Sequence, residues 1–476
     1  MPGLDPKTFF LSFGNVAAWD TGRDAMAVKV NKVRIRQLME EEERRFVQDH
    51  PRSKKLFERA KHSLLAGVPM NWMVRWAGPY PIFAKEGHGT YISDVDGHRY
   101  LDLCLGDTGS MFGHSPKAVV DAVTAQVRKG ITMMLPSEDS VWVGEELSRR
   151  FGLPYWQMAM TATDANRFSI RLAREATGRK MVMVVNGCYH GTVDETLVNL
   201  NRGRVVARSG NIGPPIDPAR TTRVVEFNDI EALEKTLRRK DVACALLEPA
   251  MTNRGIILPD PDYHDALREI TRDTETMLVI DETHTICCGI GGYTAEHGLQ
   301  PDVITMGKPL ASGIPVAAFG ISHRVADKVM ERILSDGTDE SGLGGTLTGN
   351  ALAVAAMRAT LEKVITQKNF DRMMPLAKRF EKGIKDTFDE TGLPWHVVRL
   401  GVRVEYHSTP KMPKNGAEYE ASKDCELEKL MHLMALNRGI LLTPFHNMAL
   451  ISPATTVRDV DHHTKVFRAC IEKLIG

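Results

Sequence analysis

Short apolar runs recur between about residues 115 and 330, and stretches with apolar positions at three- and four-residue steps separate them. The runs are continuous rather than alternating, which is typical of strands that are covered on both faces. They predict strands at residues 180–185, 242–248, 277–281 and 302–306. Strands that alternate with helices in this way indicate an α/β fold with a mostly parallel sheet covered by helices.

The two ends of the chain follow other patterns. Residues 20–63 are rich in helix formers and are interrupted at Pro51, so they predict two helices. The stretch "GTYISDVDGHRYLDL" alternates around Asp96-Gly97, a pair that favours a hairpin turn. Helical patterns and the alternating strand "HVVRLGVRVEYHS" after residue 350 predict a smaller α+β part. We therefore expect a helical extension (1–62), the first part of a small domain (63–110), a large domain (111–350) and the rest of the small domain (351–476).

Composition excludes several classes of protein. The 476 residues include 61 Lys and Arg and 60 Asp and Glu, mixed along the chain, which indicates no nucleic-acid partner. No apolar run approaches the roughly 18–20 residues of a membrane span, and the N-terminus has no signal-peptide pattern. The seven cysteines form no CxxC pair, which is typical of a reducing compartment. We expect a soluble, cytoplasmic protein without membrane association.

Polar side chains follow each of the four predicted strands, in the segments "NGCYHG", "EPA", "DETHT" and "GKP". Ligands bind outside the carboxyl ends of the strands in open parallel sheets, so these segments should converge on one crevice. Its candidate residues are Tyr189, His190, Glu248, Asp281, His284 and Lys308. A fifth segment, "MTATDANRFSIRLA", places hydroxylated residues before a helix, where they form either a phosphate seat or an ordinary helix cap.

A lysine and an aspartate at neighbouring strand ends, with an aromatic ring and an anion seat, suit pyridoxal phosphate (PLP). The lysine amine forms a Schiff base with the cofactor aldehyde, and the carboxylate keeps the pyridine nitrogen protonated. Each residue also has an ordinary alternative: a solvated charge for Lys308, a helix cap for Asp281 and a core position for Tyr189. No metal site is expected, because neither adjacent pair, His462-His463 or Cys287-Cys288, can direct both side chains at one ion.

A nucleotide-binding or hydride-transferring protein is the alternative from another class. The glycines of "CCGIGGYTAEHG" do not have the G-x-G-x-x-G spacing, and "GKP" places proline where a phosphate-binding loop needs a hydroxyl.

From about residue 63 to the C-terminus the chain instead resembles the class III aminotransferases of the fold-type-I PLP enzymes, in the branch that includes glutamate-1-semialdehyde aminomutase. The motifs that carry the resemblance are "DVDGHRYLDL", "RLAREATGR", "GCYHG", "FNDIEALE", "LLEP", "VIDETHT", "PDVITMGKPLASGIPVAAFG" and "GGTLTGNALA".

The resemblance implies a role for each candidate residue. Lys308 would be the Schiff-base lysine and proton shuttle, and Asp281 would pair with the pyridinium nitrogen. Further cofactor contacts would come from Tyr189 stacking on the ring, His284 beside the ring hydroxyl, the backbone N–H groups of Ala162 and Thr163 at the phosphate, and His190 and Glu248 nearby. Thr346 would reach the phosphate of the partner subunit, which implies a homodimer with shared sites. Arg75 and Arg403 are candidates for binding a substrate carboxylate.

The chain departs from the aminomutase pattern at four places. "TATDAN" replaces Ser-Gly-Thr-Glu-Ala, His284 replaces Gln or Met, the leader is longer, and "KGITMMLPSED" differs from the gating segment. These departures favour an aminotransferase that moves an amino group from an amine or a non-alpha amino acid to a keto acid by a ping-pong mechanism. The alternatives are an aminomutase that acts on an amino aldehyde such as glutamate-1-semialdehyde, and an amino-acid racemase.

Overall fold

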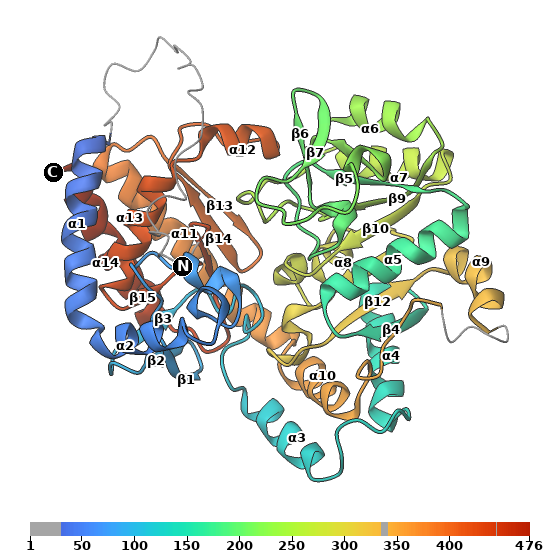
Figure 1. Ribbon diagram of the computed structural model, residues 1–476, viewed down its shortest axis with the longest axis horizontal. Coiled ribbons are helices and arrows are strands. Elements are labelled where there is room, and N and C mark those ends of the chain that lie inside the picture. The colour runs from blue at the N-terminus through green and yellow to red at the C-terminus, as the bar shows by residue number, and fades with distance from the viewer. Residues whose placement is uncertain (1–29, 335–340, 444) are drawn as a thin grey trace.

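A seven-stranded sheet forms the centre of the right-hand part of the molecule in Figure 1. The computed structural model describes residues 30–334, 341–443 and 445–476. The strands lie in the order β4-β12-β11-β10-β9-β5-β8. Only β12 runs antiparallel to its neighbours, so the predicted, mostly parallel sheet is confirmed. The bounds are β4 (Tyr155–Ala159), β5 (Met181–Val185), β8 (Thr222–Val225), β9 (Val242–Leu247), β10 (Met277–Asp281), β11 (Val303–Met306) and β12 (Ala317–Ile321).

Helices cover this sheet, and every residue of β5, β9, β10 and β11 is therefore buried. Burial on both faces explains why these strands are continuously apolar in the sequence. The surrounding elements are α3 (Lys117–Val127), α4 (Glu138–Phe151), α5 (Ala162–Thr177), α6 (Ile230–Leu237), α7 (Tyr263–Asp273), α8 (Gly292–Glu296), α9 (His323–Leu334), α10 (Ala351–Lys363) and the hairpin of β6 (Val198–Asn201) and β7 (Arg204–Ala207).

The left-hand part is built from both ends of the chain. Its four-stranded sheet has the order β1-β2-β3-β15, and the late strand β15 runs parallel to the early strand β3. A three-stranded sheet, β13-β14-β16, lies in the same part. The strands are β1 (Ala84–His88), β2 (Tyr91–Asp94), β3 (Arg99–Asp102), β13 (His396–Leu400), β14 (Arg403–His407), β15 (Ile440–Leu441) and β16 (Met448–Leu450). The expected smaller α+β part from both ends of the chain is confirmed.

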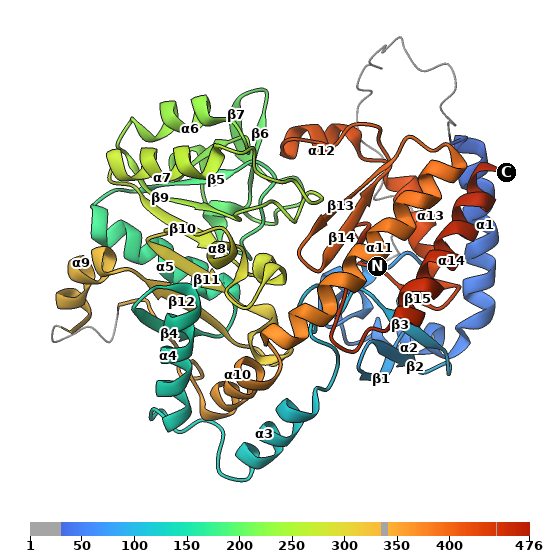
Figure 2. The same cartoon turned by 180° about the vertical axis from the view of Figure 1, so that it is seen from behind.

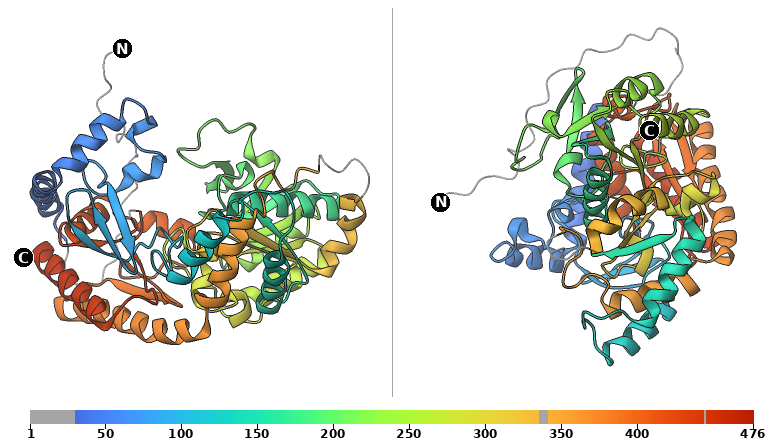
Figure 3. Two further views of the ribbon diagram at one scale, coloured as in Figure 1. Left: turned by 90° about the horizontal axis from the view of Figure 1, so that it is seen from below. Right: turned by 90° about the vertical axis from the view of Figure 1, so that its right-hand side faces the viewer.

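Helices join and cover these sheets. Figure 2 shows α11 extending from beside α10 to α14, against which it packs. Figure 3 shows the first and last helices on the same side of the molecule, where α1 packs against α13 and α14. The helices are α1 (Lys32–Asp49), α2 (Pro51–Ala60), α11 (Gln367–Thr391), α12 (Gly416–Ser422), α13 (Cys425–Leu436) and α14 (Val457–Ile475), with the 3-10 helices η2 (Leu65–Gly67), η3 (Asn71–Arg75), η4 (Asp194–Thr196), η5 (Pro218–Arg220), η6 (Thr285–Cys288) and η7 (Lys308–Ala311) in the connections.

The detailed expectations have different outcomes. Two helices do meet at Pro51, and the start of the first predicted helix lies outside the described residues. The single strand predicted in "HVVRLGVRVEYHS" is wrong, because Gly401 adopts a left-handed φ of 57° and turns the chain back between β13 and β14. The division into four parts remains a prediction. All seven cysteines are free, and no helix in the described part of the chain could span a membrane.

The turn at Gly401 provides a stability prediction. A Cβ at Gly401 would overlap the backbone carbonyl of Cys287, whereas a Cβ at Gly203, in the β6–β7 turn, would meet nothing within 4 Å. Both glycines have a left-handed φ, so Gly203→Ala should cost about 1–2 kcal/mol from the backbone conformation alone. Overpacking adds about 1–3 kcal/mol for Gly401→Ala. Thermal unfolding should show the larger loss for Gly401→Ala, and equal losses would contradict the packing argument.

Candidate active site

Lys308 begins η7, directly after strand β11, and its backbone has a left-handed φ of 46°. Its Nζ atom lies 3.0 Å from Oδ2 of Asp107 and 2.7 Å from Nε2 of His284. The preceding Gly307 lets the chain pass close to the start of α5, because a Cβ there would lie 3.1 Å from the Cβ of Ala162. The lysine amine is therefore directed into a polar cluster rather than into solvent.

Asp281 ends the neighbouring strand β10, and its side chain is buried. Its carboxylate accepts hydrogen bonds from Asn166 Nδ2 at 2.9 Å, from His190 Nδ1 at 2.9 Å and from the backbone N–H of Thr283 at 3.0 Å. Burial opposes the charge, but the bonds, first that of His190, lower the pKa of Asp281 to about 2. A buried anion with fixed orientation thus lies at the end of β10.

His284 connects the lysine to the other part of the molecule. Its Nδ1 atom lies 2.8 Å from the Thr108 hydroxyl and 2.9 Å from Nη1 of Arg403. Burial, followed by repulsion from Lys308 and Arg403, lowers the pKa of His284 well below its ordinary value, so the ring is neutral. Because a guanidinium can only donate, Nδ1 accepts and the ring proton is on Nε2, from where it can bond to the lysine nitrogen only when that amine is neutral.

Arg403 extends from β14 into this cluster and is completely buried. Its Nε and Nη2 atoms have no hydrogen-bond partner within the described chain, and Nη2 lies 3.9 Å from Oδ1 of Asp107. Burial raises the pKa of Asp107, but the positive charges of Lys308 and Arg403 outweigh it and hold this pKa below its usual range. Asp107 is therefore an anion between two cationic side chains.

The start of α5 forms the predicted anion seat only in part. The hydroxyl of Thr161 accepts from the N–H of Asp164 and caps the helix, and that of Thr163 accepts from the N–H of Thr192. Both hydroxyls are thus used by the local fold. The backbone N–H groups of Ala162 and Thr163 belong to the first helical turn, where no carbonyl of the helix can accept from them. That of Ala162 lies beside Gly307, and both are donors that remain for an anion.

The other predicted residues differ in their distance from this cluster. Tyr189 contacts Trp72 of η3 edge to face, with ring centroids 5.3 Å apart. Glu248 is buried at the end of β9 and bonds to Thr252 and Asn253 instead of to the lysine cluster. Arg75, also on η3, is exposed, and no hydrogen bond or ion pair joins it to the candidate residues in the described part of the chain. Thr346 is exposed too.

Comparisons with known proteins identify the family. The model of the family described as aminotransferase class-III matches residues 72–474. A glutamate-1-semialdehyde 2,1-aminomutase of Persephonella marina is 31% identical over 89% of this chain and 99% of its own. The crystal structure of a glutamate-1-semialdehyde aminomutase from Pseudomonas aeruginosa PAO1 is 47% identical over 94% of this chain and 99% of its own, with a TM-score of 0.92. An omega-transaminase structure from Sphaerobacter thermophilus is 28% identical over 89% of this chain and 98% of its own, with a TM-score of 0.81.

The chain belongs to the class III aminotransferase family. It has the fold-type-I architecture of a PLP-dependent transferase, and its cofactor is pyridoxal phosphate. A lysine-to-alanine variant of the Pseudomonas enzyme, solved in complex with PMP, is also 47% identical to this chain, with a TM-score of 0.91. The class III enzyme and the PLP cofactor that the sequence predicts are therefore confirmed.

The described residues fit this cofactor. Lys308 offers an amine, Asp281 offers an ionised carboxylate held by three donors, and the start of α5 offers free N–H groups next to Gly307. The hydroxyl of Thr283, a residue whose backbone N–H donates to Asp281, is a buried polar atom without a partner that a polar ligand would satisfy.

The predicted reaction is wrong. The relatives above 30% identity named here are aminomutases, whereas the transaminase is 28% identical, so amine transfer to a keto acid is not supported as the main reaction. Both reactions need the same lysine and the same carboxylate, and the motifs that carry these residues therefore do not separate them. Leader length does not separate them either, because the Pseudomonas aminomutase structure matches 94% of this chain, including part of residues 1–62.

Sequence reasoning missed three residues of the cluster. Asp107 and Thr108 lie in "LGDTGS" after a short strand of the other part, where no pattern connects them to the lysine. Asn166, which bonds to Asp281 and accepts from Thr305, follows Thr163 by three residues on the helix of the expected phosphate seat. Helical spacing would have placed Asn166 near that seat, and it is the one signal that could have been used.

The ion pair of Asp107 provides a pH prediction for the cofactor-free chain. Asp107→Asn leaves Lys308 and Arg403 without their anion, and we expect a loss of about 1–3 kcal/mol at pH 7. Because the folded chain lowers the pKa of Asp107, this stabilisation is complete above the unfolded value near 3.8 and disappears as pH falls below it. The difference in Tm between the two chains should be equal at pH 7 and pH 5 and smaller at pH 3.5.

Asp121→Asn is the matched control, because it removes an exposed carboxylate that pairs with Lys117 on α3. Exposed pairs of this kind contribute about 0–1 kcal/mol, so this variant should keep the Tm of the unmodified chain at each pH. A Tm difference for Asp107→Asn that grows as the pH falls would contradict the assignment of Asp107 as a paired anion.

Proposed function

We propose that this protein is a PLP-dependent aminomutase that acts on an amino aldehyde such as glutamate-1-semialdehyde. The observation that carries the proposal is the likeness to the Pseudomonas aminomutase, at 47% identity over 94% of this chain with a TM-score of 0.92. A 2,1-aminomutase moves the amino group from C2 to C1 and the carbonyl oxygen in the opposite direction. The amino aldehyde becomes an isomeric amino ketone, and no keto acid is consumed.

Lys308 and Asp281 would perform the central steps. When bound, PLP supplies an aldehyde that exchanges amino groups and a ring that accepts electrons from the substrate carbon. Lys308 would hold the cofactor covalently until the substrate amine displaces it, and would then move protons at the reacting carbon. Asp281 would keep a proton on the ring nitrogen, a role supported by its ionised state and its three fixed hydrogen bonds.

The remaining cofactor contacts follow from the positions of the side chains. The N–H groups of Ala162 and Thr163 would bind the phosphate, and Tyr189 would stack on the ring. His190 would orient Asp281, to which it already donates. Glu248, whose pKa burial raises, would support the same edge of the sheet from the end of β9.

The phosphate site would be completed by a second subunit. Thr346 is exposed, as a residue offered to another chain must be, and its neighbour Leu347 is an exposed apolar side chain. Both features support a homodimer with shared active sites. The free cysteines support a reducing, cytoplasmic location.

Arg403 would bind the carboxylate of the substrate. Its buried guanidinium has two nitrogen atoms without a partner in the described structure, and it lies beside His284 in the lysine cluster. A buried cation of this kind is stabilised by a carboxylate with bidentate geometry. Arg75 remains a second candidate, because its segment η3 contacts Tyr189 through Trp72.

His284 would position the lysine through its ring proton. Nδ1 accepts from Arg403, so Nε2 can donate to the nitrogen of Lys308 once that amine is neutral, and then fixes the direction of the lone pair with which the lysine bonds or takes up a proton. Arg403, His284 and Lys308 thus connect the carboxylate site to the reacting amine through hydrogen bonds.

The first test supplies one substrate and no acceptor. The holoenzyme should convert glutamate-1-semialdehyde completely into its isomeric amino ketone without any keto acid. Lys308→Ala should lower the rate about 10³-fold or more, whereas Lys328→Ala, an exposed lysine on α9, should leave the rate unchanged. Turnover that requires a keto acid would indicate a transaminase, and inversion at C2 alone would indicate a racemase. Either result would refute the proposal.

A second test asks whether the hydrogen bonds of the side chain at position 284, and not only its size, are needed for activity. Glutamine can accept from Arg403 and donate toward Lys308, whereas methionine accepts only weakly and cannot donate. We expect His284→Met to lower kcat about a hundredfold through misplacement of the lysine, and His284→Gln to remain within about tenfold of the unmodified enzyme. Steady-state kinetics of the isomerisation would measure both effects, and equal losses would exclude a role for these hydrogen bonds.

A further inference from the structure

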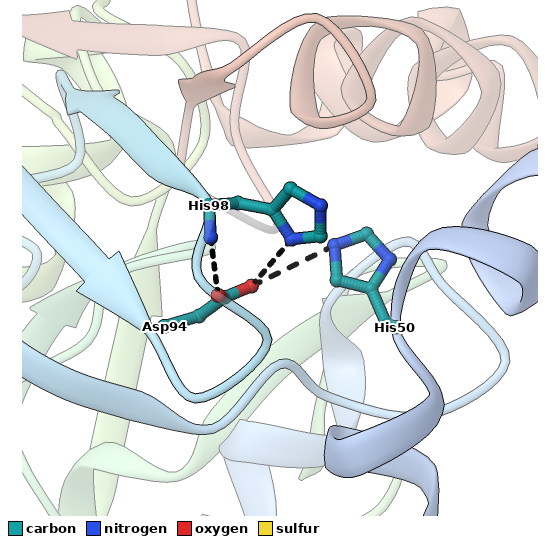
Figure 4. A group of neighbouring side chains, drawn as sticks. All are labelled: His50, Asp94 and His98. Atoms are coloured by element: carbon teal, nitrogen blue, oxygen red, sulfur yellow. Dashed lines mark hydrogen bonds and ion pairs between the residues drawn. The ribbon is translucent and has the colours of Figure 1, made fainter.

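Three side chains converge far along the chain from Lys308, where the helical extension meets the β2–β3 hairpin. His50 lies between α1 and α2, Asp94 ends β2, and His98 precedes β3, as Figure 4 shows. One donor atom from each side chain lies within 4.8 Å of the other two. The proposed reaction uses none of these residues.

The surrounding backbone orients two of the three donors. Nδ1 of His50 donates to the carbonyl of Phe46 at 2.7 Å, so Nε2 has a lone pair and faces the cluster. Oδ1 of Asp94 accepts from the backbone N–H groups of Asp96 at 2.9 Å and His98 at 2.8 Å, and Oδ2 faces the cluster. Backbone partners of this kind typically hold metal-binding histidines and carboxylates in place.

The charge of Asp94 lacks a strong partner. Its side chain is completely buried, and in the described part of the chain no lysine or arginine forms an ion pair with it. The groups near Oδ2 are the Tyr100 hydroxyl at 2.8 Å, Nδ1 of His98 at 3.1 Å and Nε2 of His50 at 3.7 Å. Buried carboxylates are normally paired with a cation or coordinate a metal ion.

The cluster also has too few protons. The Tyr100 hydroxyl lies 2.7 Å from Nε2 of His50 and 2.8 Å from Oδ2 of Asp94, and both of these atoms are acceptors. A hydroxyl carries one hydrogen, so one of the two short contacts has no hydrogen between its atoms. A bound cation would resolve this conflict.

We propose that His50, Asp94 and His98 bind a divalent transition-metal ion such as zinc. Two imidazole nitrogens and one carboxylate oxygen are a ligand set that zinc accepts, with Tyr100 or water completing the shell. His98 has a side chain that is 40% exposed, which provides access, and it coordinates through Nδ1 once its ring proton moves to the solvent-facing nitrogen. Asp96, which acts electrostatically on His50, adds negative potential that attracts a cation.

The ion would fasten the helical extension to the rest of the chain. The same hairpin already holds α2, because Asp96 accepts from the N–H groups of Arg52 and Ser53 at its first turn. A metal bound by His50 on one side and by Asp94 and His98 on the other would add a second link between these segments. The proposal replaces the expectation from the sequence that the protein has no metal site.

The test uses the full-length holoenzyme without an affinity tag and zinc chloride as the probe. His98→Asn removes the imidazole of a partly exposed ligand and keeps the backbone N–H that donates to Asp94. His88→Asn, an exposed histidine on β1, is the matched control. Equilibrium dialysis should give one zinc ion per chain for the unmodified enzyme and for His88→Asn. The zinc affinity of His98→Asn should be lower by about tenfold or more.

Thermal unfolding provides an independent measurement. Added zinc should raise the Tm of the unmodified enzyme and of His88→Asn, because an ion that binds only the folded chain stabilises it, and should raise the Tm of His98→Asn by less at the same zinc concentration. Equal zinc binding by His98→Asn and the unmodified enzyme would overturn the proposal. A chain that takes up no zinc but loses stability as the pH rises through the histidine range would also overturn it, since a proton would then be the missing cation.

Discussion

The structure depends on a buried negative charge at the carboxyl end of β10. Asp281 remains ionised because Asn166, His190 and Thr283 donate to it from three different segments. Without these donors a carboxylate in this position would take up a proton, and it could not pair with a protonated ring. Since β10 and β11 are parallel neighbours, with Asp281 opposite Thr305, the lysine that follows β11 necessarily emerges at the same edge of the sheet.

The part of the molecule built from both chain ends contacts Lys308 through the loop of residues 105–110, and the backbone is strained on both sides of this contact. Asp107, Thr108 and Lys308 are not glycines, yet all three have a left-handed φ. Each such residue costs about 1–3 kcal/mol and persists only where the surrounding contacts hold it. Here the contacts are the ion pair of Asp107 with Lys308 and the hydrogen bonds around His284. The contacts in the candidate active site therefore hold the two parts of the molecule together.

The choice between transamination and amino-group isomerisation shows what local motifs identify: they indicate the cofactor but not the reaction. The motif residues Lys308 and Asp281 are the proposed cofactor residues, and both reactions share the cofactor. Departures such as His284 leave Lys308 and Asp281 in place and therefore do not indicate which reaction takes place. In the function proposed here, substrate selection would depend on groups that approach from the other part, such as Arg403. Likeness over nearly the whole chain to an aminomutase carries more information about the reaction than any single motif does.

The sequence by itself determined the mostly parallel sheet, the position of Lys308 and Asp281 at neighbouring strand ends, and the PLP family. Continuous apolar strands and polar residues at their ends are local patterns, and the rule that ligands bind at carboxyl ends of strands converts them into a site. Only the tertiary structure decided that Asp107 and Thr108 join this site, that Arg403 rather than Arg75 contacts it, and that His50 meets Asp94 and His98. These residues are brought together by packing between segments distant in the chain, and such contacts leave no periodicity in the sequence.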